Sequence, residues 1–264
     1  MKIGFIGCGN MATAMLKGIL KSGEVEASDM IASAKSDKTR EKIEKELGIR
    51  KADNNAQVVD FADVVFLAVK PQFLEGVLDE IRGSVKAGQI FISIAPGKTL
   101  QWLGERLGEN TKVIRTMPNT PAMVGEGMTA LCVNELVTEE EIALAVKLCD
   151  TFGKTEVIPE HLMDAVVGVS GSSPAYVFMF LEAMADAAVA DGMPRAQAYK
   201  FAAQSVLGSA KLMLETGKHP GELKDMVCSP AGTTIQAVRV LEEKGFRSAV
   251  IEAQTECVKK AKGM

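Results

Sequence analysis

Residues Lys2-Ile-Gly-Phe-Ile-Gly-Cys-Gly-Asn-Met-Ala12 predict the fold of the first half of the chain. Lys2–Ile6 has the apolar character of a buried strand, and a helical run follows the glycines. Gly7 permits a tight turn, Gly9 lets a pyrophosphate approach the backbone, and Ala12 is small enough for close helix–strand packing. This G-x-G-x-x-A pattern, set between a strand and a helix, favours a dinucleotide-binding site over a purely structural turn.

The second predicted strand, Met30–Ser33, ends without the acidic residue that binds the ribose 2′-hydroxyl in NAD-selective sites. Ser33 and Lys35 stand there instead, and a hydroxyl with a cation suits a 2′-phosphate. We therefore expect NADPH as the cofactor, with NADH as the alternative. Lys38 and Arg40 follow closely and are interpreted as ordinary solvated charges of the next helix.

Further apolar runs predict the remaining strands of a largely parallel sheet. Asp63–Val69 ends at Lys70-Pro71-Gln72, and ligands of such sheets lie beyond the carboxyl ends of the strands. Lys70 is therefore either a cofactor contact or a surface lysine beside a turn. Four more strands are predicted, at Gln89–Ala95, Lys112–Thr116, Gly125–Val133 and Thr155–Ile158.

Three local motifs complete the first half. The prolines of Met117–Pro121 predict a rigid, non-helical loop that presents Asn119 and Thr120 where the nicotinamide would lie. A helix is expected over Thr138–Thr151, because its first residues form a capping box. Gly97-Lys-Thr99 resembles part of an ATP-binding loop, but the first glycine of that motif is missing, which excludes such a site. Strands alternating with helices indicate a doubly wound α/β domain.

The second half shows no convincing strand after about residue 161, and its helices are rich in alanine. Val177–Val189 is apolar nearly all round and must be buried on every side. A terminal bundle of this size is too small for that, so we expect the helix to be shared between subunits of a homo-oligomer. Ahead of it, Ser173 is expected to cap a helix with Pro174 at its first position, while Gly171 and Ser172 face a ligand.

Ser229-Pro-Ala-Gly-Thr-Thr-Ile235 precedes another helical run and has two interpretations. A helix start presents unpaired N–H groups and a partial positive charge, so it can cradle a small carboxylate or phosphate. A Ser or Thr N-cap after a turn explains the same residues without any ligand. The stretch alone favours the N-cap, and the rest of the chain has to decide between the two.

Composition limits the class of protein. The chain has 264 residues, 47% of them hydrophobic, and a net charge of −4 without a basic patch, so a nucleic-acid partner is not expected. Five cysteines without a CxxC pair indicate free thiols in a reducing compartment rather than disulfides or a zinc site. The first residues form a strand rather than a signal peptide, and the apolar run Tyr176–Leu181 is too short to span a membrane. We expect a soluble, cytoplasmic protein with no metal site.

Five stretches resemble the pyrroline-5-carboxylate reductase family, whose members catalyse the last step of proline biosynthesis, over nearly the whole chain. One departure is Ala231, where the family usually has glycine. The stretches are Gly4-Phe-Ile-Gly-Cys-Gly-Asn-Met-Ala12, Phe66-Leu-Ala-Val-Lys-Pro-Gln72, Met117–Pro121, Gly168-Val-Ser-Gly-Ser-Ser-Pro-Ala-Tyr176 and Asp225-Met-Val-Cys-Ser-Pro-Ala-Gly-Thr-Thr-Ile235.

The resemblance implies hydride transfer from NAD(P)H to the C=N bond of a small cyclic imino acid. It implies that the substrate carboxylate is held by the amides of Gly232, Thr233 and Thr234, with Ser229 shaping the loop and Ser172 also in contact. Thr234 would be the catalytic residue, either donating a proton to the ring nitrogen or only orienting it. The implied cofactor-binding residues are Ile6, Gly7, Cys8, Gly9, Asn10, Met11, Ser33, Lys35, Asn55, Ala68, Val69, Lys70, Pro71, Pro118 and Asn119.

The resemblance also implies dimers formed through interleaved C-terminal helices, which assemble further into decamers of five dimers. The expected organisation is a Rossmann-like domain over residues 1–159 and an all-helical domain for dimerisation and substrate binding over 160–264. One rival is a 3-hydroxyacid dehydrogenase related to 6-phosphogluconate dehydrogenase, but the lysine that such enzymes use is absent between Gly168 and Asp191. A second rival, a nucleotide sensor without chemistry, has no need of a carboxylate cradle.

Overall fold

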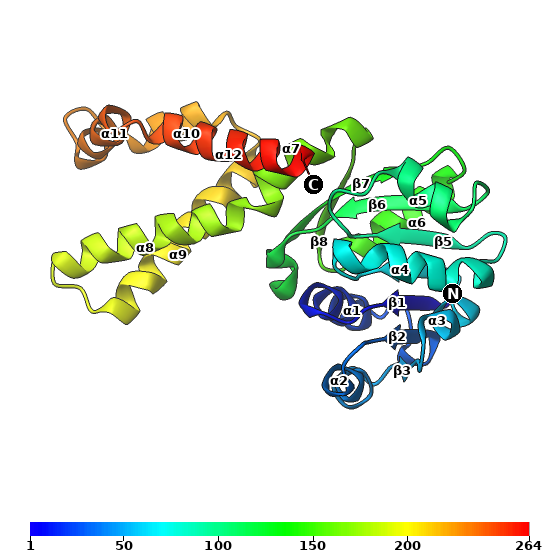
Figure 1. The fold of residues 1–264 in the computed structure, drawn as a ribbon. Coiled ribbons are helices and arrows are strands. Elements are labelled where there is room, and N and C mark those ends of the chain that lie inside the picture. The colour runs from blue at the N-terminus through cyan, green and yellow to red at the C-terminus, as the bar shows by residue number, and fades with distance from the viewer. Residues whose placement is uncertain (264) are drawn as a thin grey trace. The chain divides into compact units, whose positions relative to one another are not determined.

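The computed structural model describes residues 1–263, except the side chain of Lys42. The chain separates into two compact units (Figure 1). Unit 1 comprises Met1–Gly171 together with the chain from Val258 onward, and unit 2 comprises Ser172–Cys257. These units are defined by compactness, and the division into a cofactor domain and a substrate domain between residues 159 and 160 stays a prediction.

Unit 1 is built on one eight-stranded sheet in the order β3-β2-β1-β4-β5-β6-β7-β8. Neighbouring strands run parallel except β6 and β7, which are antiparallel. This confirms the predicted doubly wound α/β fold. The strands are β1 Ile3–Ile6, β2 Met30–Ser33, β3 Arg50–Lys51, β4 Val64–Leu67, β5 Ile90–Ser93, β6 Lys112–Met117, β7 Gly127–Val133 and β8 Gly153–Val157.

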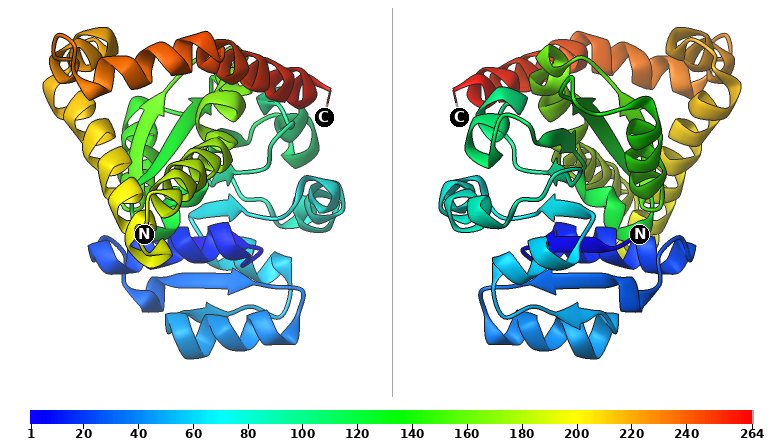
Figure 2. Two further views of the ribbon diagram at one scale, coloured as in Figure 1. Left: turned by 90° about the vertical axis from the view of Figure 1, so that its left-hand side faces the viewer. Right: turned by 90° about the vertical axis from the view of Figure 1, so that its right-hand side faces the viewer.

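Helices cover both faces of this sheet (Figure 2). The side chains of a strand alternate between faces, so Phe5 and Phe66 stack at 4.5 Å between ring centroids on one face, while Ile6 and Leu67 pack on the other. The first face is covered by α1 Asn10–Ser22, α2 Asp37–Leu47 and α6 Glu139–Asp150, and the second by α3 Asn55–Phe61, α4 Pro71–Ile81 and α5 Leu100–Leu107.

Most predicted elements of unit 1 are found within two residues of their expected bounds. The strand Met30–Ser33 is confirmed with the predicted bounds, and α6 carries both hydrogen bonds of the predicted Thr138–Glu141 capping box. The expectation of a non-helical loop over Met117–Pro121 is wrong from Thr120 onward, because a 3₁₀ turn, η3, spans Thr120–Val124. Pro121 fixes a backbone φ angle that this turn also requires.

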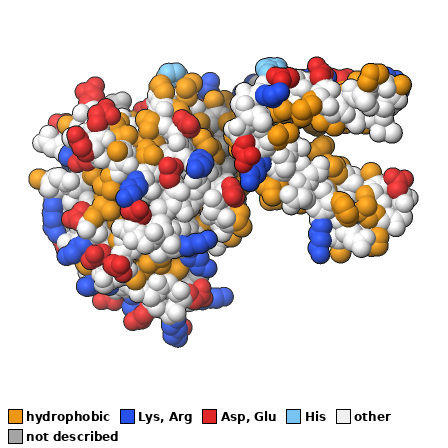
Figure 3. Space-filling view, turned by 180° about the vertical axis from the view of Figure 1, so that it is seen from behind, with side chains coloured by type: hydrophobic (Ala, Val, Ile, Leu, Met, Phe, Trp, Pro, Cys, Tyr) orange, Lys and Arg blue, Asp and Glu red, His pale blue; other side chains and the backbone are white. Residues whose placement is uncertain are grey.

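Unit 2 is helical, and no strand occurs between residues 160 and 263, as predicted. It contains α8 Ser173–Ala190, α9 Arg195–Thr216, α10 Pro220–Val227, α11 Thr233–Glu243 and most of α12 Phe246–Lys262. Its helices present many apolar side chains at the surface (Figure 3). Phe178, Met179 and Leu214 are exposed by 65%, 70% and 83%. Among the residues that the structure describes, one helical stretch, Glu160–Ala190, is by length and composition alone apolar enough to cross a membrane.

The segment that leads into α8 differs from its prediction. After α7 Met163–Val166 the chain makes a π-helical turn over Val167–Gly171, and α8 begins directly afterwards. Ser173 is therefore the first helical residue and not the N-cap. Ser172 occupies the cap position, but its side chain makes no capping hydrogen bond.

Candidate active site

The predicted cofactor residues of unit 1 gather at the carboxyl edge of the parallel strands. The backbone N–H of Gly7, just after β1, bonds the carbonyl of Ser33 at 3.1 Å, and the N–H of Ala68, after β4, bonds the carbonyl of Ile6 at 2.9 Å. Pro118 and Asn119 follow β6 at the same edge. The sheet thus brings together residues that lie more than a hundred positions apart in the chain.

Gly7 and Gly9 are required for different reasons. Gly7 has a φ of +94°, and a Cβ there would lie 2.7 Å from the carbonyl oxygen of Ala68, so the fold itself demands glycine. Gly9 has an ordinary extended backbone, and a Cβ there would meet nothing within 4 Å. Neither strain nor packing demands glycine at this position, and the absence of a side chain leaves the backbone of Gly9 open to the close approach of a ligand.

The start of α1 can receive such a ligand. Gly9 is its N-cap, no side chain caps the helix, and its first turn carries no acidic residue. The unpaired N–H groups and the positive end of the helix dipole are thus available to an anion. This is the arrangement that a cofactor pyrophosphate requires in a doubly wound fold.

A pocket of about 440 Å³ lies beside this turn, and Gly7, Ser33, Lys35 and Asn55 are among the residues that line it. The hydroxyl of Ser33 donates to Oδ1 of Asn55 at 2.6 Å. Sequence reasoning missed Glu80 of α4, whose carboxylate accepts from the backbone N–H of Asn55 at 3.2 Å and from its Nδ2 at 2.7 Å. Glu80 lies 25 positions from Asn55, and no local pattern signals the pair.

Two other predicted contacts of unit 1 are placed as follows. Lys70 is exposed and precedes α4, so both interpretations of this lysine stay open. Asn119 is buried, and both ends of its amide are used within unit 1. Its Oδ1 accepts from the N–H of Met128 at 2.8 Å, and its Nδ2 donates to the carbonyl of Ser170 at 3.0 Å.

In unit 2 the predicted anion cradle precedes α11. Gly232 is the N-cap and makes no side-chain cap bond, so the interpretation of this stretch as a Ser or Thr N-cap is wrong. The N–H of Gly232 instead closes a turn on the carbonyl of Ser229 at 3.0 Å, and a Cβ at Gly232 would lie 2.3 Å from Oγ of Ser229. The first N–H groups of α11, which belong to Thr233 and Thr234, are among those that a helix leaves without an intrahelical partner.

Ala231 holds this turn in a strained conformation. Its φ of +55° makes it the one non-glycine residue with positive φ among residues 1–263. A left-handed conformation costs a residue with a Cβ about 1–2 kcal/mol. The glycine that the resemblance led us to expect at this position would adopt this backbone angle without that strain.

Ser172 has a polar neighbour that sequence reasoning did not anticipate. The thiol of Cys257, on α12, donates to the hydroxyl of Ser172 at 3.1 Å. Burial raises the pKa of the nearby Tyr176 phenol, and a hydrogen bond with Cys257 adds to that rise. The 85 positions between Ser172 and Cys257 explain why no sequence pattern shows the contact.

Two of the thiols in unit 1 are unsuited to nucleophilic chemistry. Burial raises the pKa of Cys132 to about 12, with a smaller contribution from the charge of Glu160, and burial likewise raises the pKa of Cys149 to about 12. Both groups stay neutral thiols near pH 7, and a thiol is a poor nucleophile.

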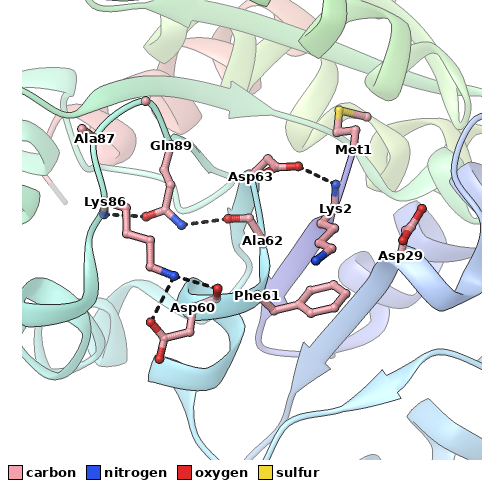
Figure 4. A pocket seen from close by; sticks show the side chains of 11 residues that line it. Met1, Lys2, Asp29, Asp60, Phe61, Ala62, Asp63, Lys86, Ala87 and Gln89 are labelled. Carbon is pink, nitrogen blue, oxygen red and sulfur yellow. Dashed lines mark hydrogen bonds and ion pairs between the residues drawn. The ribbon is translucent and has the colours of Figure 1, made fainter.

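A second pocket of unit 1, of about 540 Å³, lies at the opposite edge of the sheet (Figure 4). Its polar groups bond one another: the N–H of Lys2 donates to Asp63 at 2.8 Å, and Nε2 of Gln89 donates to the carbonyl of Ala62 at 2.8 Å. These residues precede β1, β4 and β5, so the pocket is remote from the carboxyl edge where ligands of such sheets bind.

The chain matches two protein-family models. Residues 160–264 match the model described as pyrroline-5-carboxylate reductase dimerisation, and residues 2–97 match that of the NADP oxidoreductases described as coenzyme F420-dependent. It is 56% identical to the pyrroline-5-carboxylate reductase of Escherichia coli over 260 residues, which covers 98% of this chain and 97% of the relative. The reductase of Methanosarcina acetivorans is 45% identical over 252 residues, covering 96% and 93% of the two chains.

Solved structures agree with these matches. The pyrroline-5-carboxylate reductase of Coxiella burnetii superposes with a TM-score of 0.93 at 34% identity, covering 99% of this chain and 97% of the other. The pyrroline carboxylate reductase of Plasmodium falciparum, solved with NADP bound, has a TM-score of 0.89 at 28% identity and covers 100% and 97% of the two chains.

Proposed function

The chain belongs to the pyrroline-5-carboxylate reductase family, and on that premise we propose how its residues divide the work of the reaction. The enzyme reduces 1-pyrroline-5-carboxylate to L-proline, the last step of proline biosynthesis. A nicotinamide cofactor, bound in unit 1, supplies the hydride. Unit 2 holds the imino acid.

The observation that carries the proposal is a pair of helix starts. Both α1 and α11 begin at a glycine N-cap, Gly9 and Gly232, and neither helix has a side-chain cap bond. Each start is therefore an anion site with free N–H groups. One suits the pyrophosphate of the cofactor, and the other suits the carboxylate of the substrate.

In unit 1, the N–H groups at the start of α1 bind the pyrophosphate. Ser33 and Asn55 contact the adenosine ribose, while the backbone at the carboxyl ends of β4 and β6 lines the nicotinamide end. The proposed cofactor contacts are Ile6, Gly7, Cys8, Gly9, Asn10, Met11, Ser33, Lys35, Asn55, Ala68, Val69, Lys70, Pro71, Pro118 and Asn119.

The proposal includes a preference for NADPH over NADH. It is supported by the end of β2, where Ser33 and Lys35 stand in place of an acidic residue. Lys35 is exposed, so Lys35→Ala should lower the NADPH-to-NADH ratio of kcat/KM by about tenfold at most. An unchanged ratio would remove Lys35 from the cofactor site.

In unit 2, the N–H groups of Thr233 and Thr234 hold the substrate carboxylate, whereas the expected contact from the N–H of Gly232 is given up because this group closes the turn. Ser229 shapes the turn through its carbonyl, which accepts the N–H of Gly232. Ser172 contacts the ring from the start of α8. The hydroxyl of Thr234 hydrogen-bonds the ring nitrogen, which must carry a proton before or as the hydride arrives at carbon.

The loss of rate in Thr234→Ala distinguishes whether Thr234 only orients the ring nitrogen or donates a proton to it. An orienting hydrogen bond contributes about 0.5–1.5 kcal/mol, which is about tenfold in rate. A proton donor is worth about 10²–10⁴-fold, although a threonine hydroxyl is a weak acid at neutral pH. Thr234→Ala is therefore assayed by NADPH absorbance with pyrroline-5-carboxylate, beside Thr234→Ser, which keeps the hydroxyl.

A loss below tenfold in Thr234→Ala would leave only the orienting role. Wild-type enzyme that consumes no NADPH with this substrate would defeat the proposed function as a whole. A 3-hydroxyacid dehydrogenase is disfavoured by α8, which contains no lysine.

The chain contains a dimerisation region, and we infer homodimers that assemble into decamers in the cytoplasm, with neither a membrane nor a nucleic acid as partner. The inference is supported by the exposed apolar side chains of α8 and α9 and by an apolar pocket of about 570 Å³ that includes Phe180, Met184 and Met213. A second copy would bury these surfaces. Light scattering coupled to size-exclusion chromatography tests this, and a stable monomer would contradict it.

A further inference from the structure

The pocket of about 440 Å³ beside Gly7, where we place the adenosine of the cofactor, is called the adenosine pocket below. Its neutral side chains Ser33 and Asn55 have fixed hydrogen-bond directions. The carboxylate of Glu80 can only accept, so the amide of Asn55 must turn Nδ2 toward it, at 2.7 Å. Oδ1 of Asn55 then faces Ser33, and the Ser33 hydroxyl donates its only hydrogen to that oxygen at 2.6 Å. What Ser33 and Asn55 still offer a ligand is oxygen lone pairs and one neutral N–H, which suit a ribose better than a phosphate.

The same pocket also carries negative charge. Asp53 and Glu80 both line it. A phosphate monoester has a charge of about −1.5 to −2 at neutral pH, so these carboxylates repel it. Binding of a 2′-phosphate there therefore depends on a cation, and the lining contains two, Lys35 and Arg40.

Arg40 is held in place before any ligand arrives. Its Nε donates to the backbone carbonyl of Ala34 at 2.7 Å, which anchors the guanidinium one residue beyond Ser33 at the end of β2. Its Nη1 lies 3.5 Å from Asp37, but the side chain of Asp37 is 92% exposed, and such pairs contribute little. The two Nη groups thus remain available for the planar, two-point contact that guanidinium makes with phosphate.

Lys35 is placed less specifically. Its ammonium lies 5.3 Å from the centre of the Phe73 ring, and both side chains are exposed. An ammonium on a flexible stem adds a screened point charge and no fixed geometry. Lys35 therefore supports binding, whereas Arg40 provides a preorganised group.

We propose that Arg40 recognises the 2′-phosphate of the cofactor and is the main determinant of the preference for NADPH. Lys38, which shares the helix, does not line this pocket. The inference rests on the proposed preference for NADPH and adds a residue that the sequence alone had assigned to ordinary solvated charge.

The test compares Arg40→Met with Arg50→Met in the full-length protein. Arg50 is a matched control, because its Nε also donates to a backbone carbonyl, that of Ser28 at 2.9 Å, yet it lies outside the pocket. Two quantities are measured: the NADPH-to-NADH ratio of kcat/KM, and the calorimetric affinities for adenosine 2′,5′-bisphosphate and for 5′-AMP. The second needs no catalysis, and binding of 5′-AMP shows that the pocket is folded.

Arg40→Met loses a charge-assisted contact with the 2′-phosphate. The NADPH-to-NADH ratio of kcat/KM, and the ratio of the affinities for adenosine 2′,5′-bisphosphate and 5′-AMP, should each fall by about tenfold to hundredfold. Arg40→Lys should fall between this variant and the wild type, and Arg50→Met should match the wild type. If the wild type favours the 2′-phosphate and Arg40→Met keeps that preference within twofold, the Arg40 inference alone is overturned. If the wild type binds both nucleotides equally, the NADPH preference is wrong and the inference falls with it.

Discussion

The side-chain amide of Asn119 donates to the backbone carbonyl of Ser170, and this bond ties the loop after β6 to the π-helical turn Val167–Gly171. The other end of the amide accepts the N–H of Met128 in β7. One buried side chain thus satisfies two backbone groups, and π-helical turns are frequent at functional sites. Asn119 sets the position of a loop at the proposed nicotinamide end of the cofactor.

Asn119→Ala should therefore affect stability and activity together. The buried carbonyl of Ser170 and the part-buried N–H of Met128 lose their partner, which should cost about 2–4 kcal/mol in the free energy of unfolding by urea. Asn134 is the matched control, because its amide also bonds two backbone groups, the N–H of Val113 at 3.1 Å and the carbonyl of Thr111 at 2.9 Å. Asn134→Ala should be destabilised similarly, while only Asn119→Ala loses kcat/KM for the cofactor by about tenfold or more. Equal kinetic losses would contradict this role.

Gly7 and Gly9 predict opposite phenotypes for the same substitution. Gly7→Ala forces a Cβ to within 2.7 Å of a backbone oxygen at a φ of +94°, so the melting temperature should fall. Gly9→Ala meets open space and should melt like the wild type, yet bind the cofactor more weakly, because its methyl occupies the approach of the pyrophosphate. Calorimetry with NADPH and thermal unfolding separate the two. A Gly9→Ala variant with unchanged affinity would place the pyrophosphate elsewhere.

The clash at Gly232 can be relieved from its partner. A Cβ at Gly232 would lie 2.3 Å from Oγ of Ser229, so Gly232→Ala must displace that hydroxyl or the turn, and we expect the KM for the imino acid to rise. Ser229→Ala removes that oxygen, and the double variant should recover part of the loss. A double-mutant cycle on KM measures the recovery. Strictly additive effects would show that the contact does not shape the substrate loop.

The strained backbone of Ala231 predicts that its replacement by glycine stabilises the protein. Relief of the left-handed strain, about 1–2 kcal/mol, is larger than the added chain entropy of glycine, about 0.4–1 kcal/mol, over most of these ranges, so Ala231→Gly should stabilise the protein by up to about 1.6 kcal/mol. Ala237→Gly, inside α11, should instead destabilise it by about 1 kcal/mol. Urea unfolding of both variants checks the signs. Destabilisation of Ala231→Gly would argue against the left-handed backbone at this residue.

Cys132 and Cys149 predict a loss of stability at alkaline pH. Their pKa values rise from 9.0 to about 12 in the folded chain, so between these values the unfolded chain loses the thiol protons that the folded chain keeps. The contribution of the two thiols to the free energy of unfolding is therefore complete below pH 9 and declines as the pH rises toward 12. The decline is about 1.4 kcal/mol per pH unit for each thiol in that window. Unfolding by urea across the window, compared with a Cys132→Ala/Cys149→Ala variant, measures it. Identical pH slopes would contradict the raised values.

Local patterns were sufficient for much of unit 1. The Gly7–Ala12 turn, the strand Met30–Ser33 and the Thr138 capping box each depend on residues within a few positions of one another, and all three were predicted. The two-residue strand β3, Arg50–Lys51, was missed because it is too short to show a period. The π-helical turn was missed because its glycines and serine are equally typical of a loop.

The partners of the site residues were beyond sequence reasoning. Glu80 orients Asn55 from another helix, and Cys257 reaches Ser172 across 85 positions. Arg40 was assigned to a solvated helix face because its anchor, the carbonyl of Ala34, is a backbone atom that any sequence supplies. Tertiary contacts decide such roles, and a single sequence does not show which of its distant residues meet.

The proposed self-association through the exposed apolar helices of unit 2 would make stability depend on the amount of protein present. When a second copy covers residues such as Phe178, Phe201 and Leu214, the unfolding transition includes dissociation, and its midpoint moves with protomer concentration. Newly made chains carry these surfaces in water until they meet another copy, which is when aggregation competes most strongly with assembly. Dilution should then inactivate the enzyme without any change in its chemistry.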